Sequence, residues 1–384
     1  MRIAIDVRSL TAPHKTGVSI VADALIRHMA AMEPNDEFVL FATGSTETLM
    51  NIPTYSAPNI SVVTAPIPNK VANILWLLPG GPTMERFLPD QPDAWLFPNA
   101  HVHNTRLPYV ILFHDAAIRT VPECFTLKDH ARAWAAQESR TFHNAHSVLA
   151  VSAHSKKDAV EYYGINEKHI TIASLGVDRA VFLHREQSSD RSYRAAYDLN
   201  RPYLLWLATR EPRKNVDSVI RAYTMFRNTG GDAIPLVLAG AMGWNMRHIT
   251  AALAASPYRC DIRELLYVPE KHKAALYRGA TAFLFPSLYE GFGLPVLEAM
   301  ACGTPVITSI TSALPDVAGD AALLVDPLNV TDITQALHQL LNPTTGEALR
   351  TLLRTRGLTQ ANQFSWKHPA HLALTALHSA RAEA

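Results

Sequence analysis

The chain has 384 residues, of which 48% are hydrophobic and 18% charged, and its formal net charge is +1. This length exceeds what one hydrophobic core usually spans, so we expect two domains of about 150 to 200 residues each. The near-neutral charge argues against a nucleic-acid partner. The three scattered cysteines argue against a disulfide framework or a cysteine zinc site. The lack of a long apolar run argues against a membrane-spanning helix.

The N-terminal sequence enters an alternating apolar pattern at Arg2 and lacks the long apolar segment and cleavage site of a signal peptide. We therefore expect a cytoplasmic protein with reduced thiols.

Short apolar runs alternate with helical patterns along the first half of the chain. The expected strands cover residues 2–7, 37–42, 94–98, 109–114 and 147–151. Helical patterns cover residues 17–32 and 126–144. Strands that alternate with helices predict a parallel, doubly wound sheet.

The same alternation restarts in the second half and predicts a second sheet. Its expected strands cover residues 202–208, 234–239, 264–268, 280–286, 305–308 and 322–325. The polar segment 176–200 is the expected connection between the domains. The predicted domains are residues 1–182 and 183–365, and a C-terminal helix at 366–384 is expected to pack back onto the first.

Residues 283–307 contain the most informative pattern, which reads as strand, glycine loop, short helix and strand. Pro295 suits the first turn of a helix, and Gly303 suits its end. Gly291 and Gly293 let the backbone approach a ligand, and the amides at the helix N-terminus favour an anion such as a diphosphate. This segment therefore predicts a phosphate site.

Two carboxylates, Glu290 and Glu298, lie on either side of this glycine loop. A carboxylate can accept hydrogen bonds from two neighbouring hydroxyl groups, so both could bind a sugar. The spacing is common by chance, and the alternative is a pair of solvated glutamates.

A basic turn with Arg210, Arg213 and Lys214 follows the expected strand 202–208. Ligands of open α/β sheets bind at the carboxyl ends of the strands, where three cations could hold a diphosphate and stabilise its charge as it leaves. The alternative is a solvated turn paired with Glu211.

His114 ends another expected strand, and it could bind a sugar hydroxyl or assist proton transfer. The chain has 17 histidines, so a structural or exposed role is the alternative. The sequence contains no Asp-x-Asp, no His-Glu-x-x-His, no Walker phosphate loop and no Gly-x-Gly-x-x-Gly. We therefore expect no bound metal and no nicotinamide or flavin cofactor.

The run Glu-Gly-Phe-Gly-Leu-Pro-Val-Leu-Glu at 290–298, followed by Ala-Met-Ala-Cys-Gly-Thr-Pro-Val, resembles the signature of the family-four retaining glycosyltransferases. Further matches occur in the family's order and cover most of the chain; they include residues 113–115, 175–178, 211–215, 312–327 and 364–366. The resemblance implies a GT-B fold, in which two Rossmann-like domains face a cleft.

The resemblance also implies roles for particular residues. Glu298 would hold the donor ribose, Glu290 the transferred sugar, and Arg213 and Lys214 the diphosphate, with His114 beside the reacting sugar. The remaining donor contacts would come mostly from the main chain, at Gly17, Val268, Gly291, Phe292, Gly293, Leu294 and Pro295.

Two positions depart from the family pattern. Ala208 stands where a glycine is common, and the loop 11–17 has one glycine where many relatives have two or more. Near Ala208, Arg210 also occupies a position that is often apolar in the family, which leaves open whether Arg210 or Arg213 is the main phosphate-binding arginine.

The resemblance is closest to mannosyltransferases, which implies GDP-mannose as the donor and a glycan or lipid-linked glycan of a surface polysaccharide as the acceptor. UDP- and dTDP-sugars are alternative donors. A non-catalytic nucleotide-sugar-binding protein, an epimerase and a phosphorylase are alternative functions. The stretch 74–79 is either buried core or a contact with the inner face of the cytoplasmic membrane.

Overall fold

The computed structural model describes residues 1–382, which form two compact units. The first unit contains residues 1–116, 127–176 and the segment from Ser365 onward, and the second contains residues 117–126 and 177–364. The chain thus passes from the first unit to the second after Gly176. The sequence predicted this boundary later, after residue 182.

Residues 117–126, which the sequence assigned to the first domain, pack in the second unit. The side chain of Trp244 explains this placement, because its Nε1 donates a hydrogen bond to the carbonyl oxygen of Cys124 at 2.7 Å. The indole ring also lies against the ring of Phe125, with 6.3 Å between the ring centres.

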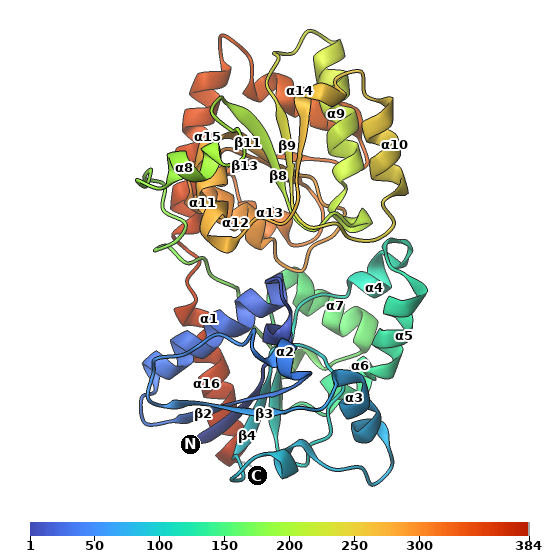
Figure 1. The fold of residues 1–384 in the computed structure, drawn as a ribbon, viewed down its shortest axis with the longest axis vertical. Coiled ribbons are helices and arrows are strands. Elements are labelled where there is room, and N and C mark those ends of the chain that lie inside the picture. Colours follow the sequence, from blue (N-terminus) through green and yellow to red (C-terminus); the bar gives the residue numbers. More distant parts are fainter. Residues whose placement is uncertain (383–384) are drawn as a thin grey trace. The chain divides into compact units, whose positions relative to one another are not determined.

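The first unit contains a sheet of parallel strands, three of which (β2, β3 and β4) are labelled in Figure 1. The strands lie in the order β3-β2-β1-β4-β5-β6-β7. They are β1 (Arg2–Asp6), β2 (Glu37–Thr43), β3 (Ile60–Ala65), β4 (Ala94–Phe97), β5 (Tyr109–Phe113), β6 (Ser147–Ala150) and β7 (Ile170–Ile172). The strand order reverses between β1 and β4, as in doubly wound sheets. The sequence did not predict β3 and β7, which are partly exposed edge strands without a continuous apolar run.

The helices of the first unit are α1 (Gly17–Met32), α2 (Thr46–Leu49), α3 (Asn69–Leu77), α5 (Leu127–Ala135), α6 (Glu138–His143), α7 (Ala153–Tyr163) and α16 (Lys367–Ala382). Helix α1 begins where predicted, because Thr16 and Ser19 form a reciprocal capping box. Helix α16 packs against α1, β4 and β5.

The helix predicted at 126–144 is in fact two helices, α5 and α6. Gln137 separates them with a left-handed backbone, at φ 46°. A non-glycine residue in this conformation interrupts the regular helix, and the charged sequence around it gives no signal for the break.

Parallel strands also form the sheet of the second unit, in the order β10-β9-β8-β11-β12-β13. They are β8 (Tyr203–Leu207), β9 (Leu236–Ala239), β10 (Ile262–Leu265), β11 (Ala280–Phe285), β12 (Val306–Ser309) and β13 (Ala322–Val325). Strand β10 lies earlier than the predicted 264–268, because Leu265 is already the partner of Ala239, the last residue of β9.

The helices of the second unit are α4 (Ala117–Thr120), α8 (Asp190–Ala195), α9 (Val216–Asn228), α10 (Arg247–Ala255), α11 (Glu270–Gly279), α12 (Leu294–Ala301), α13 (Leu314–Ala318), α14 (Val330–Leu340) and α15 (Gly346–Ala361). The expected connection 176–200 is not a free linker, since α8 packs on α11. Two hydrogen bonds of 2.5 and 2.7 Å join Arg278 to Asp190 across this contact.

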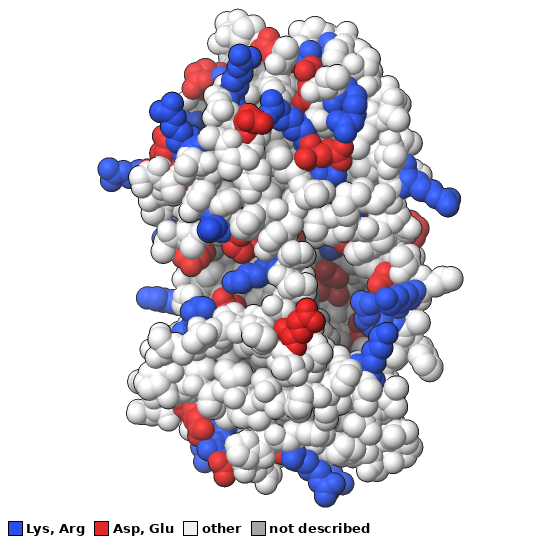
Figure 2. Space-filling view, in the orientation of Figure 1, with Lys and Arg blue, Asp and Glu red and all other residues white. Residues whose placement is uncertain are grey.

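The surface shows no large area of one charge on the face drawn in Figure 2, where basic and acidic side chains are interspersed. This distribution agrees with the net charge of +1. Within residues 1–382, no helix is both long and apolar enough to span a bilayer.

Candidate active site

The basic turn after β8 is a single turn of 3-10 helix, Pro212–Lys214. Asn215 follows it with a left-handed backbone at φ 55° and is the N-cap of α9 (Val216–Asn228). The Asn215 side-chain amide donates to the carbonyl oxygens of Pro286 and Pro327 at 2.9 and 2.7 Å. These two bonds hold the turn against the loops that follow β11 and β13.

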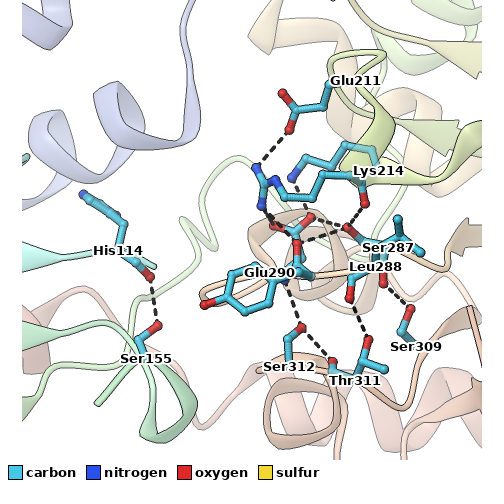
Figure 3. A network of polar contacts seen from close by, with 12 residues as sticks. His114, Ser155, Glu211, Lys214, Ser287, Leu288, Glu290, Ser309, Thr311 and Ser312 are labelled. Atoms are coloured by element: carbon cyan, nitrogen blue, oxygen red, sulfur yellow. Dashed lines mark hydrogen bonds and ion pairs between the residues drawn. The ribbon is translucent and has the colours of Figure 1, made fainter. Parts of the chain in front are cut away.

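Arg213 and Lys214 converge on the carboxylate of Glu290. Figure 3 shows Lys214 beside this carboxylate. Lys214 Nζ lies 2.5 Å from Glu290 Oε1, and Arg213 Nη1 lies 3.3 Å from Glu290 Oε2. Ser287 donates to the same carboxylate at 2.8 Å, and Glu211 pairs with Arg213 at 2.9 Å. The structure therefore brings together Arg213, Lys214 and Glu290, three of the four predicted catalytic residues. It also contains the ion pair between Arg213 and Glu211 that the alternative interpretation expected.

The Glu290 carboxylate is buried and stays ionised. Burial alone would raise its pKa, but the charges of Lys214 and Arg213, with hydrogen bonds from Lys214 and Ser287, hold the pKa below its usual value. The alternative of a solvated glutamate does not hold.

Arg210 does not belong to this group. Its side chain is fully buried, where it pairs with Glu264 and donates to the carbonyl oxygens of Leu238 and Leu265 at 3.0 Å each. These contacts join β9 and β10 inside the unit. Of the two candidate arginines, Arg213 is therefore the one next to Lys214 and Glu290.

The glycine loop before α12 leaves several amides available. Gly293 has φ 107°, a conformation that favours glycine, and a Cβ there would lie 2.6 Å from Leu314 Cδ2, so that side chain would have to shift. The backbone N–H groups of Phe292, Gly293 and Leu294 have no hydrogen-bond partner within residues 1–382. Pro295 lies in the first turn of α12, as predicted. These amides and the helix dipole suit a phosphate group.

Glu298, in α12, has a different environment from Glu290. It is also buried, and Tyr277 donates a hydrogen bond to it at 3.0 Å. Burial raises the pKa of Glu298 to about 7, against the opposing charge of Lys273. The two glutamates thus occupy separate polar groups, which fits separate binding roles.

Val268 and the preceding Leu266 and Tyr267 lie between β10 and α11, after the carboxyl end of a strand. The Val268 side chain is buried, and its main-chain N–H and C=O have no hydrogen-bond partner in the described part of the chain. A nucleobase could therefore pair with them.

His114 follows β5 in the first unit. Its Nε2 lies 2.7 Å from the carbonyl oxygen of Pro98, so Nε2 carries the proton and donates it. Burial lowers the pKa of His114, although the bond to Pro98 and the charge of Asp115 oppose this shift. Ser155 fixes the backbone by donating to the His114 carbonyl at 2.8 Å. A neutral imidazole in this orientation leaves Nδ1 as an acceptor for a hydroxyl group.

Gly17 is the first residue of α1 and is exposed. A Cβ at Gly17 would meet no atom within 4 Å, so there is open space beside this helix N-terminus. Nothing within the unit requires glycine here, so the predicted close approach of a phosphate remains a prediction.

The sequence did not single out several residues that organise the site. Ser287, Tyr277 and Ser312 hold the glutamates or their backbone, and Ser312 accepts from the Glu290 N–H at 2.9 Å. Ser287 could have been found as the hydroxyl that follows strand β11. Tyr277 and Ser312 lie on other elements, and no sequence pattern joins them to the glutamates.

No three His, Cys, Asp or Glu side chains of the described residues gather as they would around a metal ion. Metal-independent transfer stays a prediction.

Two family models together match most of the chain. The model described as Glycosyl transferases group 1 matches residues 191–352, and the model described as Glycosyltransferase Family 4 matches residues 15–181.

The proteins with similar sequences or structures are also glycosyltransferases or share their fold. The O-antigen chain mannosyltransferase B of Escherichia coli is 34% identical over 274 residues, which are 70% of this chain and 71% of that protein. The serotype-specific mannosyltransferase WbdA of Escherichia coli is 34% identical over 238 residues, 61% of this chain but 29% of that much longer protein. The solved structure of sucrose-phosphate synthase from Thermosynechococcus elongatus superposes with a TM-score of 0.79 over the full length of both chains at 18% identity, which shows a shared fold.

Proposed function

This chain belongs to the family-four glycosyltransferases of the group 1 type and has their GT-B fold, and on that premise we propose that it transfers mannose from GDP-mannose with retention of configuration. The proposed acceptor is a glycan or lipid-linked glycan of a surface polysaccharide. The observation that carries the proposal is the contact of Arg213 and Lys214 with the buried carboxylate of Glu290, beside the free amides at the start of α12. The mannosyltransferase relatives support the choice of sugar.

In the proposed reaction, the bond between the anomeric carbon and the diphosphate oxygen breaks while the acceptor oxygen bonds to that carbon on the same face. The acceptor proton passes to the departing diphosphate, so no protein nucleophile is needed. Lys214 and Arg213 would stabilise the negative charge that develops on the leaving group. Glu290 would accept from the sugar hydroxyls and steady positive charge at the anomeric carbon.

We expect transfer without a metal ion, because Arg213, Lys214 and the α12 amides would stabilise the negative charge of the diphosphate. Mannose transfer from GDP-mannose, measured in excess EDTA, should match the rate in untreated enzyme. A rate that falls to background with EDTA and returns with Mg²⁺ or Mn²⁺ would contradict this account. Transfer only from UDP- or dTDP-sugars would support the alternative donors, and binding without turnover would support the non-catalytic alternative.

His114 offers a prediction that separates the sugar from the nucleotide. His114→Ala should slow transfer by about 10²-fold, because the loss of a group that contacts the reacting sugar acts on turnover. GDP binding should stay near wild type, because the imidazole is proposed to contact only the sugar. Steady-state kinetics and calorimetry with GDP measure the two effects. An equal loss of GDP affinity would give His114 a phosphate-binding or structural role instead.

We further propose that the first unit contacts the inner face of the cytoplasmic membrane, where a lipid-linked acceptor would lie. The stretch 74–79 is not wholly core, since Ile74 is 59% exposed. No residue of α5 is buried; Leu127 and Trp134 are 89% and 83% exposed, and Lys128 follows Leu127 in the helix. Exposed apolar side chains next to basic ones suit an anionic lipid surface.

Trp134→Ala should therefore weaken co-sedimentation with anionic phosphatidylglycerol vesicles by roughly tenfold, because indole rings favour the membrane interface. Met50→Ala is the matched control, since Met50 is 81% exposed in the same unit. Equal binding of both variants and the wild type would exclude α5 as the contact.

A further inference from the structure

A cavity of about 790 Å³ opens at the amino ends of β8 and β11 in the second unit. Pro202, just before β8, and Ala280, the first residue of β11, both line it. Lys214 and Glu290 follow the carboxyl ends of the same two strands. Because parallel strands of five or six residues span roughly 17 to 20 Å, the cavity and the donor site lie at opposite edges of one sheet. A ligand in this cavity would be separate from the donor.

Arginine dominates the charged lining of this cavity, which contains no lysine. The lining arginines come from three helices and the segment before β8: Arg191, Arg194, Arg201, Arg278, Arg350 and Arg354. Only Asp232 and Glu347 line it with a carboxylate.

Half of these arginines are paired with acids. Arg278 pairs with Asp190, Arg194 with Glu186 and Arg350 with Glu347. Six guanidinium groups against these three carboxylates and that of Asp232 leave an excess of two positive charges.

The excess charge belongs to identifiable side chains. Arg191 and Arg201 are exposed and have no hydrogen-bond or ion-pair partner in the described residues. Arg354 donates through Nε to the carbonyl oxygen of Gly303 at 3.1 Å, a contact that orients the guanidinium without neutralising it. These three groups present free donors at the cavity.

The backbone makes room for one arginine in the lining. Gly279 ends α11, and a Cβ there would lie 2.4 Å from Arg194 Cδ and 2.8 Å from the Tyr203 hydroxyl. A residue larger than glycine would push Arg194 out of its position.

Capping of helix ends explains only part of this arrangement. Arg350 donates to the carbonyl oxygen of Leu340, the last residue of α14, which is a common role for a basic residue at a helix C-terminus. Arg191 and Arg201 make no such contact, so capping leaves them unexplained.

We propose that this cavity is a second anion site, which binds a small phosphate-bearing molecule with at least two negative charges. Guanidinium groups match phosphate oxygens in pairs, which makes arginine the preferred residue for phosphate recognition. The volume lies within the range of small-molecule sites, about 300 to 1,000 Å³, and has room for more than an inorganic phosphate. Nothing in the proposed transfer reaction uses this site.

The test is calorimetry with inorganic pyrophosphate on a Lys214→Ala enzyme. Pyrophosphate lacks the base and ribose of GDP, so its binding at the donor site depends on the phosphate contacts that this substitution weakens. Pyrophosphate should still bind, and further substitution of Arg191, Arg201 and Arg354 by alanine should weaken this binding by roughly tenfold to hundredfold, since charged hydrogen bonds are lost from partly exposed groups.

The matched control replaces Arg221, Arg247 and Arg356, exposed arginines of the same unit that do not line the cavity. This variant removes the same charge and should bind pyrophosphate like its Lys214→Ala parent. Equal weakening in both triple variants would show that only net charge matters and would overturn the proposal. Loss of all pyrophosphate binding in Lys214→Ala alone would also overturn it, because the donor site would then be the only anion site.

Discussion

Replacement of Lys214 by alanine is expected to lower kcat by about 10²-fold or more, with a much smaller change in GDP affinity. Lys214 Nζ contacts Glu290 and has further protons to donate to a diphosphate oxygen. Negative charge on that oxygen grows as the bond to the sugar breaks, so the contact is stronger in the transition state than in the bound donor. The measurement is the rate of GDP release under saturating donor, together with calorimetry with GDP.

The control for this substitution is Lys157→Ala, which removes an exposed lysine of the first unit. It should leave both the rate and GDP affinity unchanged. Thermal unfolding of the Lys214 variant is also needed, because Glu290 would lose one of its two cations. An unchanged rate in a folded Lys214→Ala enzyme would assign leaving-group stabilisation to Arg213 alone.

Glu290 and Glu298 are expected to give different binding patterns when each is replaced by glutamine. Glu298→Gln should weaken GDP and GDP-mannose alike, by about 1.5 to 3 kcal/mol, since both ligands contain the ribose diol. Glu290→Gln should leave GDP binding near wild type, because its proposed partners are hydroxyls of the sugar. It should weaken GDP-mannose and slow transfer. Calorimetry with GDP and a non-hydrolysable GDP-mannose analogue separates the two, and identical or reversed patterns would contradict the division of roles.

The pH dependence of nucleotide binding gives a second view of Glu298. Its pKa is raised to about 7, so the carboxyl group becomes protonated as the pH falls below 7 and loses capacity to accept from the ribose hydroxyls. GDP affinity of the wild type should therefore decrease as the pH falls through about 7. The Glu298→Gln variant should show little of this dependence.

The sequence predicted the fold well where a local pattern determines the element. The alternation of buried strands and amphipathic helices placed α1, and Pro295 with Gly303 located α12. The sequence-based prediction failed where tertiary contacts determine the secondary structure. The partly exposed edge strand β3 lacks an apolar run, and the left-handed Gln137 divides a charged stretch that has helical periodicity throughout.

The principal residues of the candidate active site were predicted from sequence motifs, but the distances and contacts between them could not be predicted from the sequence. The basic turn and the glycine loop are contiguous in sequence, so Lys214 and Glu290 were candidates from the start. Their contact spans 76 positions and depends on β8 and β11 being neighbours in the sheet. Arg210 instead lies beside β9, the neighbour of β8 on its other side, where it is buried and joins β9 and β10. The spacing of three cations in one turn does not reveal this difference from Arg213.

The central claim is that this glycosyltransferase uses GDP-mannose and retains the configuration of the sugar. It is tested most directly by incubating the enzyme with GDP-mannose, UDP-glucose and dTDP-glucose in turn, each with a panel of lipid-linked oligosaccharides, and determining the product linkage by NMR. The account predicts an α-mannoside formed from GDP-mannose, the same anomer as in the donor, and no product from the other two donors. A β-mannoside, or transfer from UDP-glucose or dTDP-glucose in place of GDP-mannose, would contradict it.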